Sequence, residues 1–243
     1  MIPVKDDNPV DRTPLVTYAL VLANVLAFLW QIGLPGTLAA PDVLHAMRRH
    51  LELSVLRGGA IPYEILTLHD VSPKDIVPPP LTVFTSMFLH GGPLHLAFNM
   101  LFLWIFGNNV EDALGRVRFL LFYAICGIVA ALGQVVFSLT PEAQLTPMVG
   151  ASGAIAGVLA AYLLLFPKAR VLTLVIVFVF VRLVPLPAGW FIGIWFAGQI
   201  LAVLLGANTG VAFFAHIGGF LAGLVLIRAL GRRPGWHRRR TGW

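Results

Sequence analysis

A succession of long apolar runs constrains this chain most strongly. Hydrophobic residues make up 58% of its 243 residues and charged residues 12%, against roughly 25% charged residues in soluble domains. A run of about 20 apolar residues is long enough to cross the hydrocarbon core of a bilayer as a helix. The sequence therefore predicts an all-α polytopic membrane protein with six transmembrane helices, at approximately residues 15–34, 93–109, 118–139, 151–166, 189–205 and 211–230.

Two segments between these runs do not fit a spanning helix. Residues 35–92 form a long first loop that contains both signs of charge and the proline cluster "VPPPL". The apolar piece Val171–Val181 has only 11 residues, a length typical of segments that lie in the interface or re-enter the membrane. We treat residues 1–243 as a single membrane domain, because no other part of the sequence suggests a second core.

The distribution of basic residues predicts the orientation. In the six-span arrangement, thirteen of the seventeen Lys and Arg residues fall on the side that carries the N-terminal segment 1–14 and the tail 231–243. Basic residues are enriched in cytoplasmic loops, so both termini are expected in the cytoplasm. We expect a bacterial plasma membrane, because the chain is compact and no added domain is evident in it. The tail "RRPGWHRRR" is expected to contact anionic lipid headgroups rather than nucleic acid, because no nucleic-acid-binding motif accompanies it.

Four polar residues inside the predicted spans fall at a common depth. We measured depth at 1.5 Å per residue from the charged residue at the cytoplasmic end of each span. Ser152 and His95 lie about 24 Å from that end, and His216 and Asn99 lie about 18 Å from it. Polar residues in a membrane are costly, so this layer is a candidate functional site.

Ser152 also lies at the start of the shortest of the six predicted spans. Residues 151–166 are too few to cross the membrane, so a short fourth helix is expected to start inside it, with unpaired backbone N–H groups beside the serine. Two GxxxG pairs, Gly153/Gly157 and Gly219/Gly223, would let this helix approach the helix that carries His216. A histidine can then act as the base that activates the serine, while His95, Asn99 and the helix-end N–H groups stabilise an oxyanion.

Other interpretations of these residues remain open at this point. The small residues around Ser152 can serve helix packing alone, and the same surfaces would suit a non-catalytic membrane chaperone or adaptor that binds client transmembrane helices. Two histidines and an asparagine could be metal or haem ligands. However, no carboxylate or thiol lies in the same layer, so we expect no metal and no cofactor, and no acidic third member of a triad.

We expect structural roles for three other polar residues, His90, Glu111 and Asp112. His90 is off the helix face shared by His95 and Asn99, and we expect it to order the preceding loop through hydrogen bonds. Glu111 and Asp112 lie near a helix end with Arg116 and Arg118, which suggests a cluster of ion pairs at the membrane boundary.

Four motifs resemble those of the rhomboid family of intramembrane serine proteases. They are "GASG" at Gly150–Gly153, "HGGPLHLAFN" at His90–Asn99, "AHIGGFLAG" at Ala215–Gly223 and "GNNVEDALG" at Gly107–Gly115. A departure is Leu81-Thr82, where many members carry Trp-Arg, which leaves open how the first loop is anchored.

The resemblance implies a serine endopeptidase that cleaves single-span membrane proteins within the membrane. Ser152 would be the nucleophile and His216 the base of a Ser–His dyad that forms an acyl-enzyme. His95, Asn99 and the Ser152 backbone N–H would form the oxyanion hole. The substrate helix would enter sideways near the second and fifth spans, and it would have to unwind before its carbonyl could be attacked. Structural positions near the site would be His90, Gly150, Gly153, Gly157, Gly219, Gly223 and Glu111.

Overall fold

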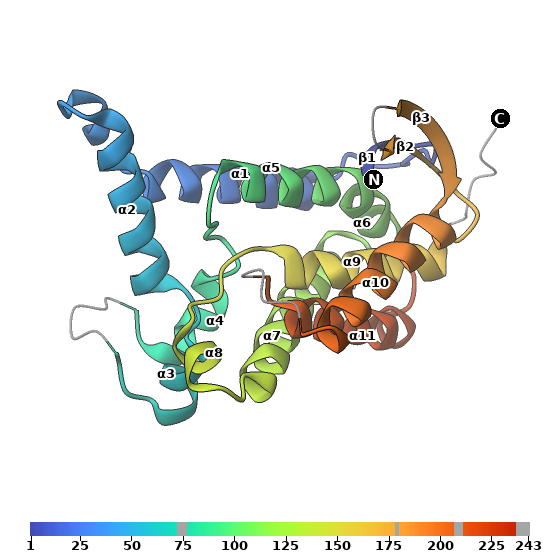
Figure 1. Cartoon of the computed structure of the whole chain (residues 1–243). Coiled ribbons are helices and arrows are strands. Elements are labelled where there is room, and N and C mark those ends of the chain that lie inside the picture. Colours follow the sequence, from blue (N-terminus) through green and yellow to red (C-terminus); the bar gives the residue numbers. More distant parts are fainter. Residues whose placement is uncertain (72–76, 178–179, 207–210, 237–243) are drawn as a thin grey trace.

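The computed structural model describes residues 1–71, 77–177, 180–206 and 211–236, and most of these residues are helical (Figure 1). The helices are α1 (Leu15–Gln31), α2 (Val43–Gly58), α3 (Pro62–Thr67), α4 (Pro79–Thr85), α5 (Pro93–Phe102), α6 (Asn108–Leu114), α7 (Arg116–Phe137), α8 (Pro141–Leu145), α9 (Ser152–Leu165), α10 (Ala188–Leu204) and α11 (Phe213–Leu230). The short helix η1 (Gly36–Ala39) follows α1, and the π-helical turn η2 (Leu103–Gly107) joins α5 to α6. Helices α2, α3 and α4 occupy half of what the sequence predicted as a long first loop.

Several of these helices have the length and composition of membrane helices. Among the described residues, the segment Leu15–Ala39 and helices α7 and α11 are long and apolar enough to cross a bilayer. Helices α9 and α10 are apolar but shorter, with 14 and 17 residues. The 14 residues of α9 rise about 21 Å, which is less than the roughly 30 Å of a hydrocarbon core.

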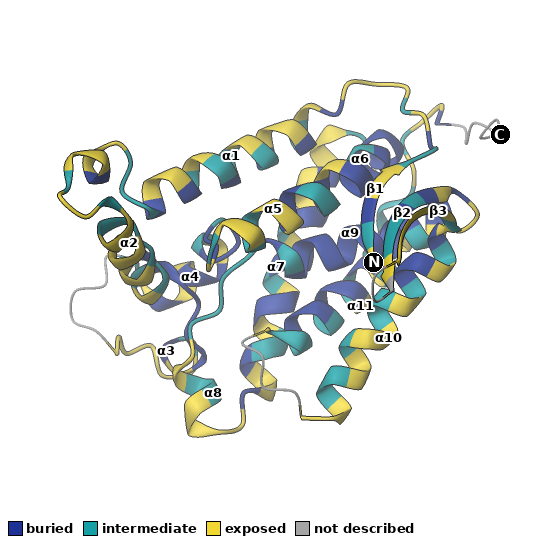
Figure 2. Ribbon diagram, turned by 45° about the horizontal axis from the view of Figure 1, so that its top comes forward, coloured by how far each residue is buried: buried dark blue, intermediate teal, exposed yellow. Residues whose placement is uncertain are grey.

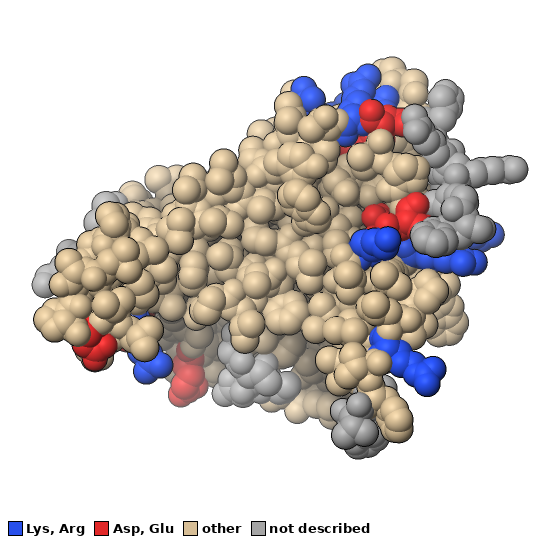
Figure 3. All heavy atoms as spheres, turned by 90° about the horizontal axis from the view of Figure 1, so that it is seen from above, with Lys and Arg blue, Asp and Glu red and all other residues tan. Residues whose placement is uncertain are grey.

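The charged residues are unevenly distributed over the surface. In the view of Figure 3, Lys, Arg, Asp and Glu gather toward the two ends of the molecule, and a broad uncharged surface separates them. Large apolar side chains are exposed on α1, α7 and α10, among them Leu22, Leu132 and Leu201. An exposed apolar surface of this extent is unusual in a soluble monomer and suits contact with lipid.

Helix α9 forms the centre of the fold. It packs against both α7 and α11, which also pack against each other, and most of its residues are buried (Figure 2). The outer helices α1 and α10 expose much more of their length in the same view. Because a helix buried on all sides cannot present a polar face to water, the apolar composition of α9 follows from its place in the core.

A three-stranded sheet corrects the prediction of an all-α protein. Strands β1 (Ile2–Asp6), β2 (Arg170–Val177) and β3 (Phe180–Pro187) pair antiparallel in the order β1-β2-β3. The described residues of the piece Val171–Val181, expected to lie in the interface or re-enter the membrane, thus belong to β2 and β3. Its valines and isoleucine favour a strand, and the third strand comes from the N-terminal segment, more than 160 residues away in the sequence.

A polar network ties β1 to the end of α9 that is distant from Ser152. The Tyr162 hydroxyl donates to Asp6 Oδ2 over 2.5 Å, and Asn109 Nδ2 of α6 donates to the same oxygen over 2.9 Å. Asn8 Nδ2 lies 3.4 Å from the Tyr162 hydroxyl oxygen. Burial raises the pKa of Asp6 to about 6, and the Tyr162 hydrogen bond opposes this shift.

Glu111 secures the beginning of α1. Its carboxylate accepts hydrogen bonds from the backbone N–H groups of Val16 and Thr17 and from the Thr17 hydroxyl, over 2.7 to 3.0 Å. These N–H groups lack partners within α1, and a carboxylate also suits the positive end of the helix dipole. The prediction of an ion-pair cluster is therefore wrong for Glu111. Its carboxylate contacts the start of α1 and forms no ion pair with Arg116 or Arg118.

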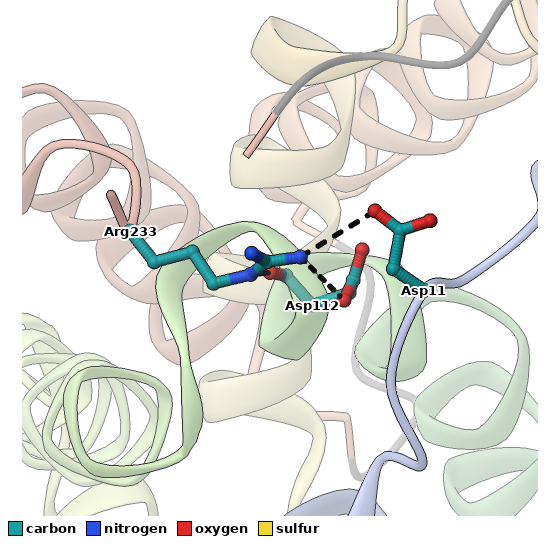
Figure 4. A network of polar contacts seen from close by, with 3 residues as sticks. All are labelled: Asp11, Asp112 and Arg233. Carbon is teal, nitrogen blue, oxygen red and sulfur yellow. Dashed lines mark hydrogen bonds and ion pairs between the residues drawn. The ribbon is translucent and has the colours of Figure 1, made fainter. Parts of the chain in front are cut away.

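Asp112, the other acidic residue of the predicted cluster, binds Arg233 in the segment after α11 (Figure 4). Arg233 Nη2 lies 3.2 Å from Asp112 Oδ1 and 3.5 Å from Asp11 Oδ2, and Arg233 Nε donates to the Asp112 carbonyl. Arg118 instead donates to backbone carbonyls of residues 230 and 232. Arg233 thus contacts protein, and three further arginines of the predicted polybasic tail, residues 238–240, lie outside the described residues.

Candidate active site

Ser152 is the first residue of α9, and its hydroxyl faces α11. The Ser152 Oγ lies 2.8 Å from His216 Nε2. Gly150 precedes the helix with a φ of +124°, a conformation that side-chain-bearing residues rarely adopt, and its N–H donates to the Ser86 carbonyl. This turn directs the chain into α9 so that the serine stands at the helix start.

Close approach of α9 and α11 brings the two side chains together. A Cβ added at Gly219 would overlap the carbonyl oxygen of Gly153, and one added at Gly223 would overlap the backbone of Gly157. Gly157 also faces Cys126 of α7 at a distance that leaves no room for a side chain. We call the contacts of Gly153 with Gly219 and of Gly157 with Gly223 the glycine seam. The seam begins one residue after Ser152 and three residues after His216, so it sets the distance between the hydroxyl and the imidazole.

Helix α10 contacts the other side of the His216 ring. Gln199 Oε1 lies 2.7 Å from His216 Nδ1, and the Trp195 ring lies 5.8 Å from the imidazole, centroid to centroid. Gln134 Oε1 of α7 accepts from the N–H of Ala215 over 3.2 Å. Sequence reasoning missed Gln199 and Trp195. A signal was present, because Gln199 is the one residue with an amide, hydroxyl or charged group in the run 190–205.

His95 and Asn99 stand on one face of α5, toward the start of α9. His95 Nδ1 accepts from the N–H of Gly91 over 3.3 Å, so the ring hydrogen lies on Nε2. A Cβ built on Gly150 would lie 2.8 Å from this Nε2 and 3.7 Å from Ser152 Oγ, which shows that the imidazole N–H points toward the loop before the serine. Asn99 Nδ2 donates one hydrogen to the His95 carbonyl and retains a second one.

These side chains share one cavity of about 600 Å³. Its lining includes Ser152, His216, His95, Asn99, Gln134 and Trp195. Apolar side chains such as Phe98 and Met148 complete the wall, and no Asp, Glu, Lys or Arg among the described residues lines it. The four polar residues that the sequence put at one depth therefore meet at a single cavity with room for a peptide segment.

His90 is packed beside this site, but its ring makes no polar contact with a described residue. The His90 ring lies edge-on to that of His95, with centroids 5.1 Å apart. Its backbone N–H donates to Gln31 Oε1 and its carbonyl accepts from Gln31 Nε2. The loop is thus held to α1 through the His90 backbone, and the prediction that this residue orders the loop needs no ring hydrogen bond. Burial lowers the pKa of the His90 imidazole to about 4.

The described residues contain no group of three His, Cys, Asp or Glu side chains close enough to bind a metal ion. Glu111, expected near the site, lies instead at the start of α1, as described above. The arrangement that the structure does assemble is a hydroxyl beside an imidazole, with a second imidazole N–H and an amide N–H across the same cavity. Such a set of groups can transfer a proton and stabilise a negative oxygen.

A family model for the rhomboid domain matches residues 80–233, which is more than half of the chain. The chain belongs to the rhomboid family. With its exposed apolar helices, it is a multi-pass membrane protein.

Relatives of this rhomboid occur in bacteria and in mitochondria. The chain is 36% identical over 156 residues to the "Rhomboid protease GluP" of Bacillus subtilis, which covers 61% of this chain and 26% of that protein. It is 34% identical over 160 residues to the "Rhomboid protein 1, mitochondrial" of Saccharomyces cerevisiae, covering 63% and 42%. It is 33% identical over 167 residues to the "Presenilin-associated rhomboid-like protein A, mitochondrial" of Danio rerio, covering 65% and 39%. The matches thus span between about a quarter and two fifths of these relatives' lengths.

Proposed function

We propose that this rhomboid is an intramembrane serine endopeptidase that cleaves transmembrane-helix substrates through a Ser152–His216 dyad. The observation that carries the proposal is the 2.8 Å contact between Ser152 Oγ and His216 Nε2 at the wall of a cavity. A serine hydroxyl is a weak nucleophile until a neighbouring base removes its proton, and an imidazole is the usual base.

The reaction proceeds in two steps. Ser152 Oγ attacks the scissile carbonyl carbon while its proton passes to His216 Nε2, which then protonates the leaving amine and leaves an acyl-enzyme. A water molecule next attacks the ester carbonyl and gives its proton to the same imidazole, which returns it to Ser152 Oγ as the acid product departs. In each step His216 therefore acts first as a general base and then as a general acid.

The negative oxygen formed in each step requires hydrogen-bond donors. His95 Nε2–H points toward the loop before Ser152, and the second amide hydrogen of Asn99 is available in the same cavity. The N–H of Ser152 lies at the start of α9, where helical partners are absent. We assign these three groups to the oxyanion hole, whose donors each contribute a factor of about 100 to 1,000 in turnover.

The membrane arrangement is part of the same proposal. We place six spans in the membrane, with α5, η2 and α6 as one span and α9 and α10 as the two short ones, in a bacterial plasma membrane. Both termini are then cytoplasmic, next to the charged end that carries β1–β3, and the residues at the end of the tail contact anionic lipid headgroups. Because α9 is shorter than the bilayer core, Ser152 stands below the opposite surface and needs a water-filled cavity above it.

The substrate is a single-span membrane protein that enters between α5 and α10. Phe102 of α5 and Phe191 of α10 are in contact, with ring centroids 6.1 Å apart, at the end of these helices away from Ser152. Nearer the serine, Phe98 and Trp195 from the same two helices line the cavity. A substrate segment with small or helix-breaking residues would unwind there most readily, because helical carbonyls are hydrogen-bonded and covered.

The decisive experiment uses the full chain reconstituted in liposomes with a model single-span substrate. We expect cleavage near the outer end of the substrate helix and labelling of Ser152 by a fluorophosphonate probe. Ser152→Ala should abolish both signals, and His216→Ala should abolish cleavage and strongly reduce labelling. Cleavage that survives Ser152→Ala would refute the dyad. Substrate binding with neither cleavage nor labelling would instead identify a non-catalytic chaperone or adaptor.

A further inference from the structure

We infer that Gln199 is a positioning residue that fixes the tautomer and the ring orientation of His216. This inference rests on the proposed function, because it concerns how the base of the dyad is prepared. The contact that carries it joins Gln199 Oε1 to His216 Nδ1 over 2.7 Å, on the side of the imidazole away from Ser152. None of the four sequence motifs supplies a residue that orients His216. Gln199 of α10, which lies outside these motifs, does so.

The orientation of the Gln199 amide follows from its second contact. Gln199 Nε2 lies 3.4 Å from the carbonyl oxygen of Trp195, one turn earlier in α10. A carbonyl oxygen can only accept a hydrogen bond, so the amide nitrogen faces Trp195 and the amide oxygen faces His216. Both polar atoms of the Gln199 amide are therefore hydrogen-bonded, the nitrogen to the backbone of α10 and the oxygen to the His216 imidazole.

This orientation determines which imidazole nitrogen carries the hydrogen. Gln199 Oε1 is an acceptor, so His216 Nδ1 must be the N–H donor. In a neutral ring the hydrogen is then absent from Nε2, whose lone pair faces the Ser152 hydroxyl over 2.8 Å. That is the tautomer which can accept the serine proton, and the other tautomer would present an N–H to the serine.

Packing restricts the ring further. Trp195 and Gln199 are four residues apart and share one face of α10, so both contact His216. The indole is tilted by 40° relative to the imidazole, with the ring centroids 5.8 Å apart. The tryptophan thus limits tilting of the ring, while the glutamine limits its rotation.

A neutral acceptor suits this position better than a carboxylate. The other titratable side chain at the cavity is His95 of α5, and none of the described residues that line the cavity is Asp, Glu, Lys or Arg. An ionised carboxylate in such surroundings would be buried without a partner whenever the imidazole is neutral, which is costly within a membrane. An amide oxygen can hold the Nδ1 hydrogen without introducing a charge.

Gln199 should affect turnover and leave substrate binding unchanged. It is not among the residues that line the cavity, so it contacts His216 from behind and has no direct route to the substrate. Replacing the carboxylate that orients a catalytic histidine in a soluble serine protease lowers kcat by about 10,000-fold through the wrong tautomer. A neutral acceptor contributes less, and we expect a reduction in kcat of about 10- to 100-fold with KM within twofold.

The test compares three variants of the full chain in liposomes. Gln199→Met removes the acceptor at similar side-chain length, whereas Gln199→Glu keeps an oxygen acceptor. Gln144→Met makes the same chemical change on α8, where the Gln144 side chain is absent from the cavity lining. We expect low kcat for Gln199→Met, recovery to within about tenfold of the parent for Gln199→Glu, and no change for Gln144→Met.

A spectroscopic measurement tests the tautomer directly. In protein labelled with ¹⁵N-histidine, the His216 signals are identified by their loss in His216→Ala. Above the titration range of the ring, we expect Nδ1 to be protonated and Nε2 to be unprotonated in the parent protein, and a mixture of tautomers in Gln199→Met.

The outcomes separate the inference from the proposed function. A parent protein with the hydrogen on His216 Nε2 would overturn the role of Gln199, and so would a Gln199→Met variant with unchanged kcat. Survival of cleavage in Ser152→Ala would defeat the dyad instead, and the nitrogen spectra would still decide the tautomer. Should Gln199→Met not fold, the parent spectrum and Gln199→Glu carry the test.

Discussion

The seam between α9 and α11 offers a sharp test of how the site is built. A Cβ added at Gly219 would overlap the carbonyl oxygen of Gly153, whereas one added at Gly218 would lie 3.4 Å from its nearest neighbour, the Val129 carbonyl oxygen. Both substitutions to alanine raise the helix propensity of α11 by the same amount, about 1 kcal/mol. Gly218→Ala is therefore a matched control for Gly219→Ala, one position away in the same helix.

The size of the expected effect follows from the overlap. A carbon atom needs about 3.5 Å to a non-bonded neighbour, so Gly219→Ala must separate the two helices locally by roughly 1.5 Å. The Ser152 Oγ to His216 Nε2 distance, now 2.8 Å, would then exceed the hydrogen-bond range. A displacement of 1 Å costs about 100-fold in rate, and overpacking of a core costs about 1–3 kcal/mol of stability.

The assay is cleavage of a single-span substrate in liposomes, with thermal unfolding measured in detergent on the same preparations. We expect Gly219→Ala to lose about 100-fold in kcat and to unfold at a lower temperature. Gly218→Ala should match the parent in kcat and unfold at the same or a higher temperature. A Gly219→Ala protein with the parent's turnover would refute the reasoning, because the seam would then not set the distance between hydroxyl and imidazole.

Three further predictions concern other contacts. Asn99→Leu should lower kcat by about 100-fold or more with little change in KM, because an oxyanion forms only during reaction; a raised KM with unchanged kcat would contradict the assigned role. The Asp6 carboxyl, with its pKa raised to about 6, favours the folded state below about pH 4, and this contribution of up to about 3 kcal/mol is lost as the pH rises through 6. Asp6→Asn should flatten that part of the stability profile, measured by thermal unfolding between pH 4 and pH 8, and an unchanged slope would argue against it. Glu111→Gln should destabilise the fold by about 1–3 kcal/mol through weaker contacts to the start of α1, while Glu142→Gln on α8 serves as a control with no expected effect.

The long apolar helices and the layer of polar residues were accessible from the sequence, since both depend on local patterns, whereas α2, α3 and α4 were predicted as a loop. The bounds of the apolar runs lie within a few residues of apolar helices such as α7, α9 and α10, and a rise of 1.5 Å per residue was enough to bring Ser152, His216, His95 and Asn99 to one depth. The structure brings these side chains to a common cavity. Helix geometry converts spacing along the chain directly into height, which is why this part of the site could be predicted.

The remainder depends on contacts between distant segments. Strand β1 pairs with β2 across more than 160 residues, and no local pattern in either segment names its partner. Glu111 was assigned to an ion pair because its neighbours in sequence are basic, but its actual partners are backbone N–H groups of another helix. Gln199 was overlooked because its importance comes from which face of α10 meets His216, and that requires the packing of two helices.

The pairing of β1 with β2 also has a mechanical consequence. Everything from α1 to α9 lies in the chain between these two strands, so the sheet closes a large loop of the polypeptide. A pull on the first residues would load the β1–β2 ladder and the Asp6–Tyr162 contact before any tension reached α1. Single-molecule extraction from the N-terminal end should therefore begin with a rupture at the sheet, separate from the later release of the membrane helices.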